Sequence, residues 1–257
     1  MSSHAVVNEF GHLLSLDQWL AMALAILFAS LMRAFSGFGF ALLAVPVFSL
    51  FLTPGDSVVL SASLTWLVTA MTYRSWWGQF PTSGVPTMLL SSLLGTAIGA
   101  AFLVTMSVDG FRGAIGVVVI IASLLLFRVK PRPRLVSSPF AAVVGLSSGV
   151  MNGAFAIPGP PVILYALAAI TSPRESRAFL MMFFLFSNTV SLLAFATLGL
   201  VSERSLLLVP AALPVMLIGD GLGRWLFEKT GGAAYRPLAI GVSCLVGFII
   251  VTKAWFL

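Results

Sequence analysis

Two short stretches rich in glycine and proline interrupt apolar sequence, and their residue types suit the binding of an anion. The first stretch holds Ser36, Gly37, Gly39 and Pro46, and the second holds Asn152, Gly153, Pro158, Gly159 and Pro161. Glycine permits unusual backbone angles and proline removes a helix hydrogen bond, so each stretch predicts a helix that stops and restarts. A restarted helix offers unpaired N–H groups and the positive end of its dipole to an anion. Kinks or close-packed glycines would explain one such stretch, but two of them favour a site.

Two charged residues within apolar sequence are further candidates. Arg33 lies three residues before the first break. It would either supply positive charge to an anion or extend to the membrane interface as a helix-end arginine. Asp220 is the one acid well inside an apolar run, where acids are costly and usually functional, although Arg224 at i+4 offers a plain helical ion pair. Our hypothesis is that Arg33 attracts the anion and that Asp220 is its proton-linked partner in coupling.

The remaining polar side chains suggest binding rather than catalysis. Ser36, Asn152 and Asn188 could donate or accept hydrogen bonds with an oxyanion, or could join helices to one another. The two histidines, His4 and His12, lie in the N-terminal tail, so they predict neither a Ser–His pair nor a metal site inside the apolar region. With no phosphate-binding glycine loop either, we expect no enzyme activity, no metal and no cofactor.

The composition indicates a polytopic all-α membrane protein. Charged residues make up 9% of the 257 residues, apolar residues make up 59%, and mean hydropathy is +1.07. A soluble domain is about one quarter charged. The basic residues are dispersed and form no stripe, which argues against a nucleic-acid partner, and one cysteine excludes a disulfide scaffold.

Charges and Gly/Pro residues divide the chain into pieces of membrane length, because a crossing needs roughly 20 apolar residues. The predicted segments are 18–35, 40–53, 57–73, 84–105 and 111–127, followed by 138–152, 157–171, 178–198, 204–224 and 236–254. They predict an N-terminal tail (1–17), a first transmembrane repeat (18–127), a basic linker (128–137) and a second repeat (138–257). We expect 8–10 transmembrane helices, with the first hairpin of each half broken.

The distribution of basic residues predicts the orientation. With the 128–137 linker in the cytosol and all ten segments crossing, eleven Lys and Arg residues lie inside and three outside. Basic residues in short loops favour the cytoplasmic side. Both termini are therefore predicted to be periplasmic.

The two halves show weak internal similarity, which predicts inverted repeats because each half has an odd number of segments. A spacing of 115 residues pairs Pro46 with Pro161, and a spacing of 124 pairs Gly95 with Gly219. Such repeats are common in secondary transporters, whose sites lie at broken helices near the midplane. At these spacings Arg33 and Asp220 correspond to Ser148 and Thr96. Neither charge is therefore required by a common scaffold.

The first break, Ser36-Gly37-Phe38-Gly39 followed by Val45-Pro46, and its second copy at 145–161 resemble the sulfite exporter TauE/SafE family. The resemblance covers nearly the whole chain. It implies a bacterial inner-membrane transporter of sulfite, sulfonates or other small organic anions. The chain departs from the fuller family motif Gly-x-Gly-Gly-Gly because Phe40 and Ala41 follow Gly39, which implies a narrower or more apolar pocket.

Together these features predict a secondary transporter of a small sulfur-containing or organic anion, driven by an ion gradient, with a proton as the expected coupling ion. A channel-like anion facilitator and a membrane subunit of a larger complex are the alternatives. The expected partners are the anion and membrane lipids, and a homodimer is one possible assembly.

Reporter fusions test the predicted orientation. A fusion at Leu257 should show periplasmic activity, and a fusion within the 128–137 linker should show cytoplasmic activity. Cytoplasmic activity at Leu257 would contradict the odd number of crossings in each half.

Overall fold

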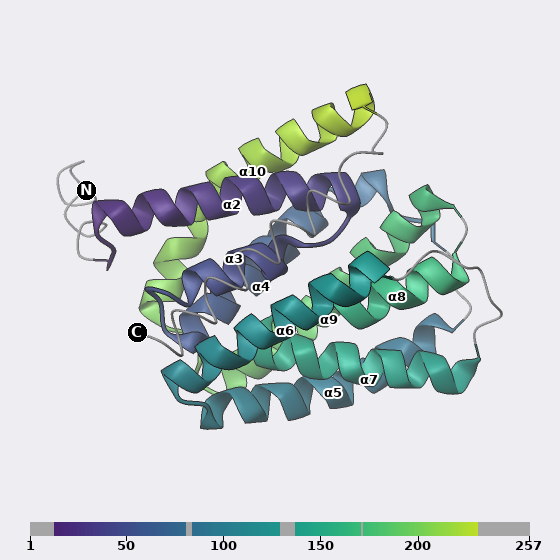
Figure 1. Ribbon diagram of the computed structural model, residues 1–257, viewed down its shortest axis with the longest axis horizontal. Helices are drawn as coiled ribbons and strands as arrows, with labels where there is room; N and C mark the ends of the chain where they lie inside the picture. The colour runs from purple at the N-terminus through teal and green to yellow at the C-terminus, as the bar shows by residue number, and fades with distance from the viewer. Residues whose placement is uncertain (1–12, 81–83, 129–136, 171, 231–257) are drawn as a thin grey trace.

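The structure is a computed structural model that describes residues 13–80, 84–128, 137–170 and 172–230 (Figure 1). The last predicted segment (236–254), most of the N-terminal tail and most of the basic linker lie outside the described residues. The domain division at these places therefore stays a prediction.

The described residues form nine α-helices and one short 3-10 helix, without a strand, which confirms the all-α class. The helices are α2 (Leu16–Ser36), α3 (Phe40–Phe48), α4 (Pro54–Met71), α5 (Val85–Thr105), α6 (Val108–Arg128), α7 (Ser138–Phe155), α8 (Gly159–Ala169), α9 (Pro173–Thr197) and α10 (Glu203–Thr230), with η1 (Tyr73–Ser75) after α4. Each helix falls on one predicted segment.

Four helices of the described part are both long and apolar enough to cross a membrane. Their spans are Leu16–Ala34, Val85–Thr105, Arg174–Thr197 and Glu203–Leu226. By contrast, α3 and α8 have 9 and 11 residues. At 1.5 Å per residue each of these helices alone reaches about half of a 30 Å hydrocarbon core, so each forms only part of a broken segment.

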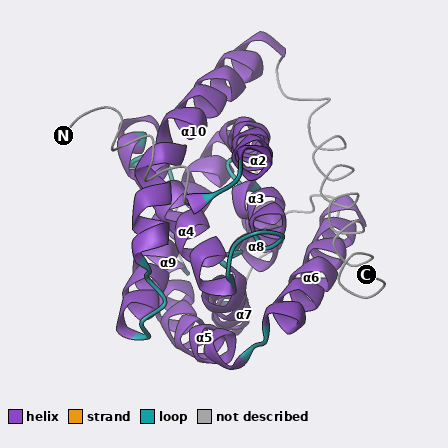
Figure 2. Cartoon of the chain, turned by 90° about the vertical axis from the view of Figure 1, so that its left-hand side faces the viewer, coloured by secondary structure: helices purple, strands orange, loops and turns teal. Residues whose placement is uncertain are grey.

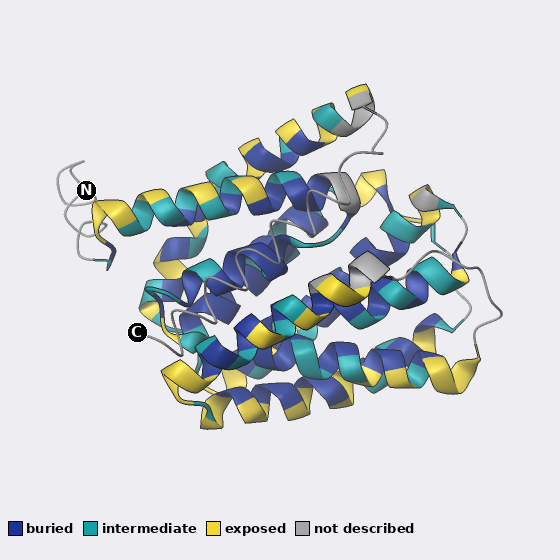
Figure 3. Ribbon diagram, viewed as in Figure 1, coloured by how far each residue is buried: buried dark blue, intermediate teal, exposed yellow. Residues whose placement is uncertain are grey.

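The outer faces of the helices are apolar, as lipid contact requires. On α5 the four most exposed large apolar side chains are Leu90, Leu94, Ile98 and Phe102, one every fourth residue. A helix facing water would carry polar residues on this stripe. Figure 3 shows the same alternation of exposed outer and buried inner faces along α5, α2 and α10.

A seam of glycines holds α5 against α7 at backbone contact. A Cβ on Gly99 would overlap the carbonyl oxygen of Val150, and one on Gly149 would overlap that of Ser92. The glycines of this seam are Gly95 and Gly99 on α5 and Gly145, Gly149 and Gly153 on α7. Small residues at i and i+4 let helix backbones approach closely in membranes, where dispersion contacts replace the hydrophobic effect.

A second seam joins α10 to α2. A Cβ on Gly219 would approach the carbonyl oxygen of Leu27, and one on Gly223 would overlap that of Leu31. Residue numbers rise together along both seams, so the paired helices run parallel. The α2–α10 pair lies at the top of Figure 2 and the α5–α7 pair at the bottom, with α3, α4, α8 and α9 between them.

The breaks and the helix starts that follow them repeat between the two halves at a spacing of 119 residues. The matching positions are the C-caps Gly37 and Ala156, the first residues Phe40 and Gly159 of α3 and α8, and the first residues Pro54 and Pro173 of α4 and α9. The seams agree, since Leu27 and Leu146 contact Gly219 and Gly95 and also differ by 119.

The spacing of 115 taken from the sequence is therefore wrong for the first part of each half. Pro46 lies inside α3, whereas Pro161 lies in the first turn of α8, so they are not equivalent. The counterpart of Arg33 becomes Asn152 rather than Ser148. Prolines produced the error because they are allowed both at helix starts and in membrane helices, so a shared proline fixes no register.

The direction of the chain is consistent with inverted halves. In Figure 1, α2 starts at the left, whereas α6 ends and α7 starts at the right. The first helices of the two halves therefore run in opposite directions through the molecule. The inverted relation of the complete halves stays a prediction, because the last predicted segment lies outside the described residues.

Gly153 tests the α5–α7 seam. Gly153→Ala places a methyl group against the carbonyl oxygen of Thr96, and overpacking of this kind costs about 1–3 kcal/mol of unfolding free energy. Gly221→Ala is the matched control, because no atom lies within 4 Å of its added Cβ. Thermal unfolding of the purified proteins should show a lower midpoint for Gly153→Ala alone. Equal midpoints would contradict backbone contact at this seam.

Candidate functional site

The first break is a turn that only glycine adopts comfortably. Gly37 has φ +82°, and its N–H donates to the carbonyl oxygen of Arg33 at 2.7 Å, which ends α2. Gly39, with φ +97°, then starts α3. A Cβ on Gly37 would also lie 2.9 Å from Cγ of Arg177. The turn therefore requires glycine for both backbone angle and space.

The second break has the same form with different residues. Ala156 takes the left-handed conformation, with φ +55°, and its N–H donates to the carbonyl oxygen of Asn152 at 2.8 Å. The hydroxyl of Ser148 donates to the carbonyl oxygen of Pro158. A left-handed residue at the C-cap is the ordinary way to end a helix. In both halves the chain thus stops and restarts, as the sequence predicts.

The two restarted helices differ in the donors they present. The N-cap residue of α3, Gly39, has no side chain to act as a cap, and the N–H groups of Phe40, Ala41 and Leu42 in the first turn have no helical acceptor. The corresponding turn of α8 is Gly159-Pro160-Pro161, and the two prolines carry no N–H group. Most of the backbone donors at the breaks therefore come from α3.

A small cavity of about 30 Å³ lies between the two breaks. One wall consists of residues 38–42 and the other of residues 156–159. Arg33 of α2, Thr65 of α4, and Phe184 and Asn188 of α9 complete the lining. Both halves therefore contribute a break and a third helix to one small, mostly apolar chamber. Its volume is far below the range of about 300–1,000 Å³ for small-molecule sites.

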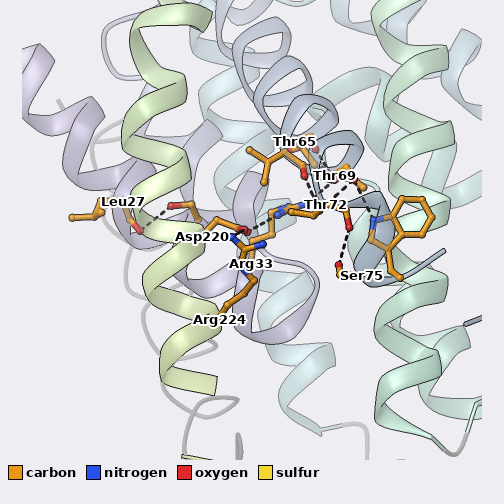
Figure 4. A network of polar contacts seen from close by, with 11 residues as sticks. Leu27, Arg33, Thr65, Thr69, Thr72, Ser75, Asp220 and Arg224 are labelled. Atoms are coloured by element: carbon orange, nitrogen blue, oxygen red, sulfur yellow. Dashed lines mark hydrogen bonds and ion pairs between the residues drawn. The ribbon is translucent and has the colours of Figure 1, made fainter. Parts of the chain in front are cut away.

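Arg33 connects this cavity to a buried polar network (Figure 4). Its side chain is 2% exposed, its Nη1 donates to Asp220 Oδ1 at 2.8 Å, and its Nη2 donates to Thr69 Oγ1 at 2.6 Å. The Thr69 hydroxyl in turn donates to the carbonyl oxygen of Thr65 at 2.6 Å. The network fixes the guanidinium between α2, α4 and α10.

Asp220 has two arginine partners. Its Oδ2 lies 3.5 Å from Nη2 of Arg224, whose side chain is 44% exposed. The i,i+4 ion pair between Asp220 and Arg224 that the sequence suggests is therefore present, but the shorter and fully buried contact is with Arg33. The carboxylate of Asp220 is thus shared by a buried and a partly exposed guanidinium.

The structure brings some of the predicted site residues to the cavity. Arg33, Gly39, Pro158 and Gly159 line it, and Asp220 reaches it through Arg33. Gly37 shapes the first turn without being a lining residue. Of Ser36 the structure describes only the backbone, so its side chain stays untested.

Other predicted residues have positions elsewhere. Gly153 packs against Thr96 and Ala100 of α5, and Asn152 donates to Ser187 and Ser191 of α9 at 2.6–2.9 Å. Neither residue is among those that line the cavity, and Pro46 and Pro161 are also absent from its lining. Bulky substitution at Gly153 should therefore damage packing first, rather than block a site.

Sequence reasoning missed most of the apolar wall. Phe38, Ile157 and Phe184 line the cavity, but aromatic and aliphatic residues occur throughout the chain and carry no distinguishing signal. Asn188 was noted as a polar residue without being assigned to the site. Among the described residues no group of three His, Cys, Asp or Glu side chains could hold a metal ion.

Comparison with known proteins agrees with this architecture. The family model "Sulfite exporter TauE/SafE" matches residues 22–250. The chain belongs to the TauE/SafE family. Membership makes it a transmembrane transporter, in accord with its long apolar helices.

This TauE/SafE protein also resembles a curated relative from Cupriavidus necator named "Probable sulfite/organosulfonate exporter TauE". The two are 30% identical over 112 residues, which is 44% of each chain. The match thus spans less than half of the relative. No solved structure matches the chain.

The Arg33–Asp220 pair of this TauE/SafE protein can be tested by a double-mutant cycle. Arg33→Gln leaves Asp220 with the more distant Arg224, and breaking a buried ion pair costs about 3–5 kcal/mol of unfolding free energy. The double variant Arg33→Gln/Asp220→Asn should be more stable than either single variant, because neither charge of the Arg33–Asp220 pair is left without the other. Thermal unfolding midpoints measure this. Additive losses would show that the pair does not couple α2 to α10.

Proposed function

We propose that the protein is a secondary transporter that carries a small anion of the sulfite or sulfonate class through the cavity between the two breaks. The observation that carries this proposal is a buried arginine, Arg33, in the lining of a cavity that also receives the uncapped first turn of α3. The printed name of the C. necator relative supports the same substrate class.

The chemistry of the cavity favours an anion. Moving an anion out of water is costly unless charge and hydrogen bonds replace its hydration. The guanidinium of Arg33 supplies charge, and the N–H groups of Phe40, Ala41 and Leu42 supply donors at the positive end of a helix dipole. The substrate would displace part of the contact between Arg33 and Asp220, because Asp220 is the anion that now balances Arg33.

The rest of the cavity limits the size and shape of the substrate. Phe38, Ile157 and Phe184 provide aromatic and aliphatic surface opposite the polar groups. The small volume restricts the substrate to sulfite, or to a sulfonate or carboxylate with a short carbon chain, and the walls must move apart to admit it. The sequence also implies an apolar wall, because Phe40 and Ala41 stand where the family motif has glycines.

The setting of the transporter is a bacterial inner membrane, with both termini in the periplasm and the basic linker in the cytosol. The eleven-to-three distribution of basic residues supports this orientation. In Figure 1 the end of α6 and the start of α7 lie on the same side of the molecule, which is compatible with this orientation.

Asp220 is our proposed site of proton coupling. Protonation would remove its charge and release Arg33, which could then hold the substrate anion more tightly. Loss of the proton from Asp220 would favour release of the anion, because the charged Asp220 would again compete for Arg33. No catalytic step is required, and neither a metal nor a cofactor takes part.

Transport of radiolabelled sulfite into proteoliposomes tests the proposal. The wild-type protein should accumulate sulfite in response to an imposed pH gradient. The double variant Arg33→Gln/Asp220→Asn, which leaves the net charge of the network unchanged, should lose at least about tenfold in rate because it lacks the buried arginine. Asp220→Asn alone should retain exchange of sulfite for sulfite without responding to the pH gradient.

A second acidic residue serves as the control. Asp56 is also buried and accepts hydrogen bonds from Thr53 and Ser202, but it is not among the residues that line the cavity. Asp56→Asn should keep its response to the gradient. Wild-type flux that ignores the gradient would indicate a facilitator, and full proton-driven transport by Asp220→Asn would reduce Asp220 to a structural partner.

A further inference from the structure

Asn188 carries a buried hydrogen-bond acceptor that no protein group satisfies among the described residues. The residue is 1% exposed and lines the cavity, and its Oδ1 has no hydrogen-bond partner. A buried acceptor without a donor costs about 1–3 kcal/mol. Such an atom at the wall of a binding cavity points to a ligand that supplies the missing donor.

The orientation of the Asn188 amide is fixed by its neighbour. Its Nδ2 donates to the carbonyl oxygen of Phe184 at 2.8 Å, one turn earlier in α9. Rotating the amide by 180° would place two acceptor oxygens against each other, so the oxygen must remain on the unpartnered side. This lining residue therefore keeps a buried acceptor without a donor from the described residues.

The other half of the molecule shows how the equivalent position is satisfied. At the spacing of 119 residues, Asn188 corresponds to Thr69 and Asn152 corresponds to Arg33. Thr69 Oγ1 accepts a hydrogen bond from Arg33 at 2.6 Å. In the second half, Asn152 instead donates to Ser187 and Ser191, so Asn188 receives no such donor from α7. One donor is missing from an otherwise repeated arrangement.

We infer that the transported anion carries its own O–H or N–H group, and that Asn188 accepts a hydrogen bond from it. The inference rests on the proposed function, because it assigns the anionic group to Arg33 and the α3 N-terminus. The substrate class is then a small monoanion with a donor, such as a hydroxy- or amino-substituted sulfonate or carboxylate, or a protonated oxyanion.

A matched pair of ligands tests this directly. Ethanesulfonate and 2-hydroxyethanesulfonate share the anionic group and carbon chain and differ by one hydroxyl group. Their dissociation constants can be obtained from thermal shifts of the purified full-length protein. We expect the hydroxylated ligand to bind the wild-type protein at least about tenfold more tightly, since it satisfies Asn188.

Substitutions at Asn188 separate this role from a structural one. Asn188→Leu should reduce the affinity ratio of the two ligands to about one. Asn188→Thr, which introduces the residue found at position 69, keeps an acceptor and should retain a preference of about threefold. Asn152→Thr is the control, because Asn152 is equally buried but is not a lining residue, and it should keep the wild-type ratio.

The outcomes distinguish the two proposals. Equal binding of both ligands by the wild-type protein, or an unchanged ratio in Asn188→Leu, would overturn the inference while leaving an anion site in place. Absence of binding for both sulfonates and for sulfite would overturn the proposed anion site itself, and the inference with it.

Discussion

A guanidinium group buried in an apolar interior needs an anionic partner, and much of this structure follows from that requirement at Arg33. Desolvation of a charge costs several kcal/mol, which a close counter-charge and further hydrogen bonds must offset. Asp220 can supply the counter-charge only if α10 lies directly against α2. The glycines at 219 and 223 allow that approach, because any side chain there would meet the backbone of α2. The first and last described helices are therefore joined around one charge pair.

Arg33 also lies at the first break, so one residue serves both helix packing and the proposed binding site. Its carbonyl oxygen accepts the hydrogen bond that ends α2, while its guanidinium reaches the cavity between the breaks. The corresponding position in the second half is an uncharged amide that binds within its own half. Two similar halves thus enclose one cavity whose sides differ in charge, in backbone donors and in unmet acceptors. This difference, rather than the shared scaffold, gives the cavity its chemical character.

Sequence alone predicted the architecture well because membrane crossing imposes length and apolarity on each segment. It also located both breaks, since the need for a positive φ at Gly37 is visible as glycine. The register between the halves was wrong because prolines were matched across different helix positions. Asn152 and Gly153 were assigned to the site from the sequence but do not line the cavity, for a related reason. A helix turns by about 100° per residue, so neighbours in sequence face different helices, and only the packed structure shows which face meets the cavity.

The glycine seam between α5 and α7 also bears on how such a protein can diverge. Five glycines there contact backbone atoms of the opposite helix, so almost any substitution is excluded whatever the substrate. Lipid-facing positions such as Leu94 need only remain apolar. Substitutions that change substrate selectivity are therefore confined to the few residues that line the chamber. Two of these residues, Phe184 and Asn188, lie on one turn of α9. Descendants of one ancestral transporter could acquire different cargoes through changes in that single turn, with their scaffold left almost untouched.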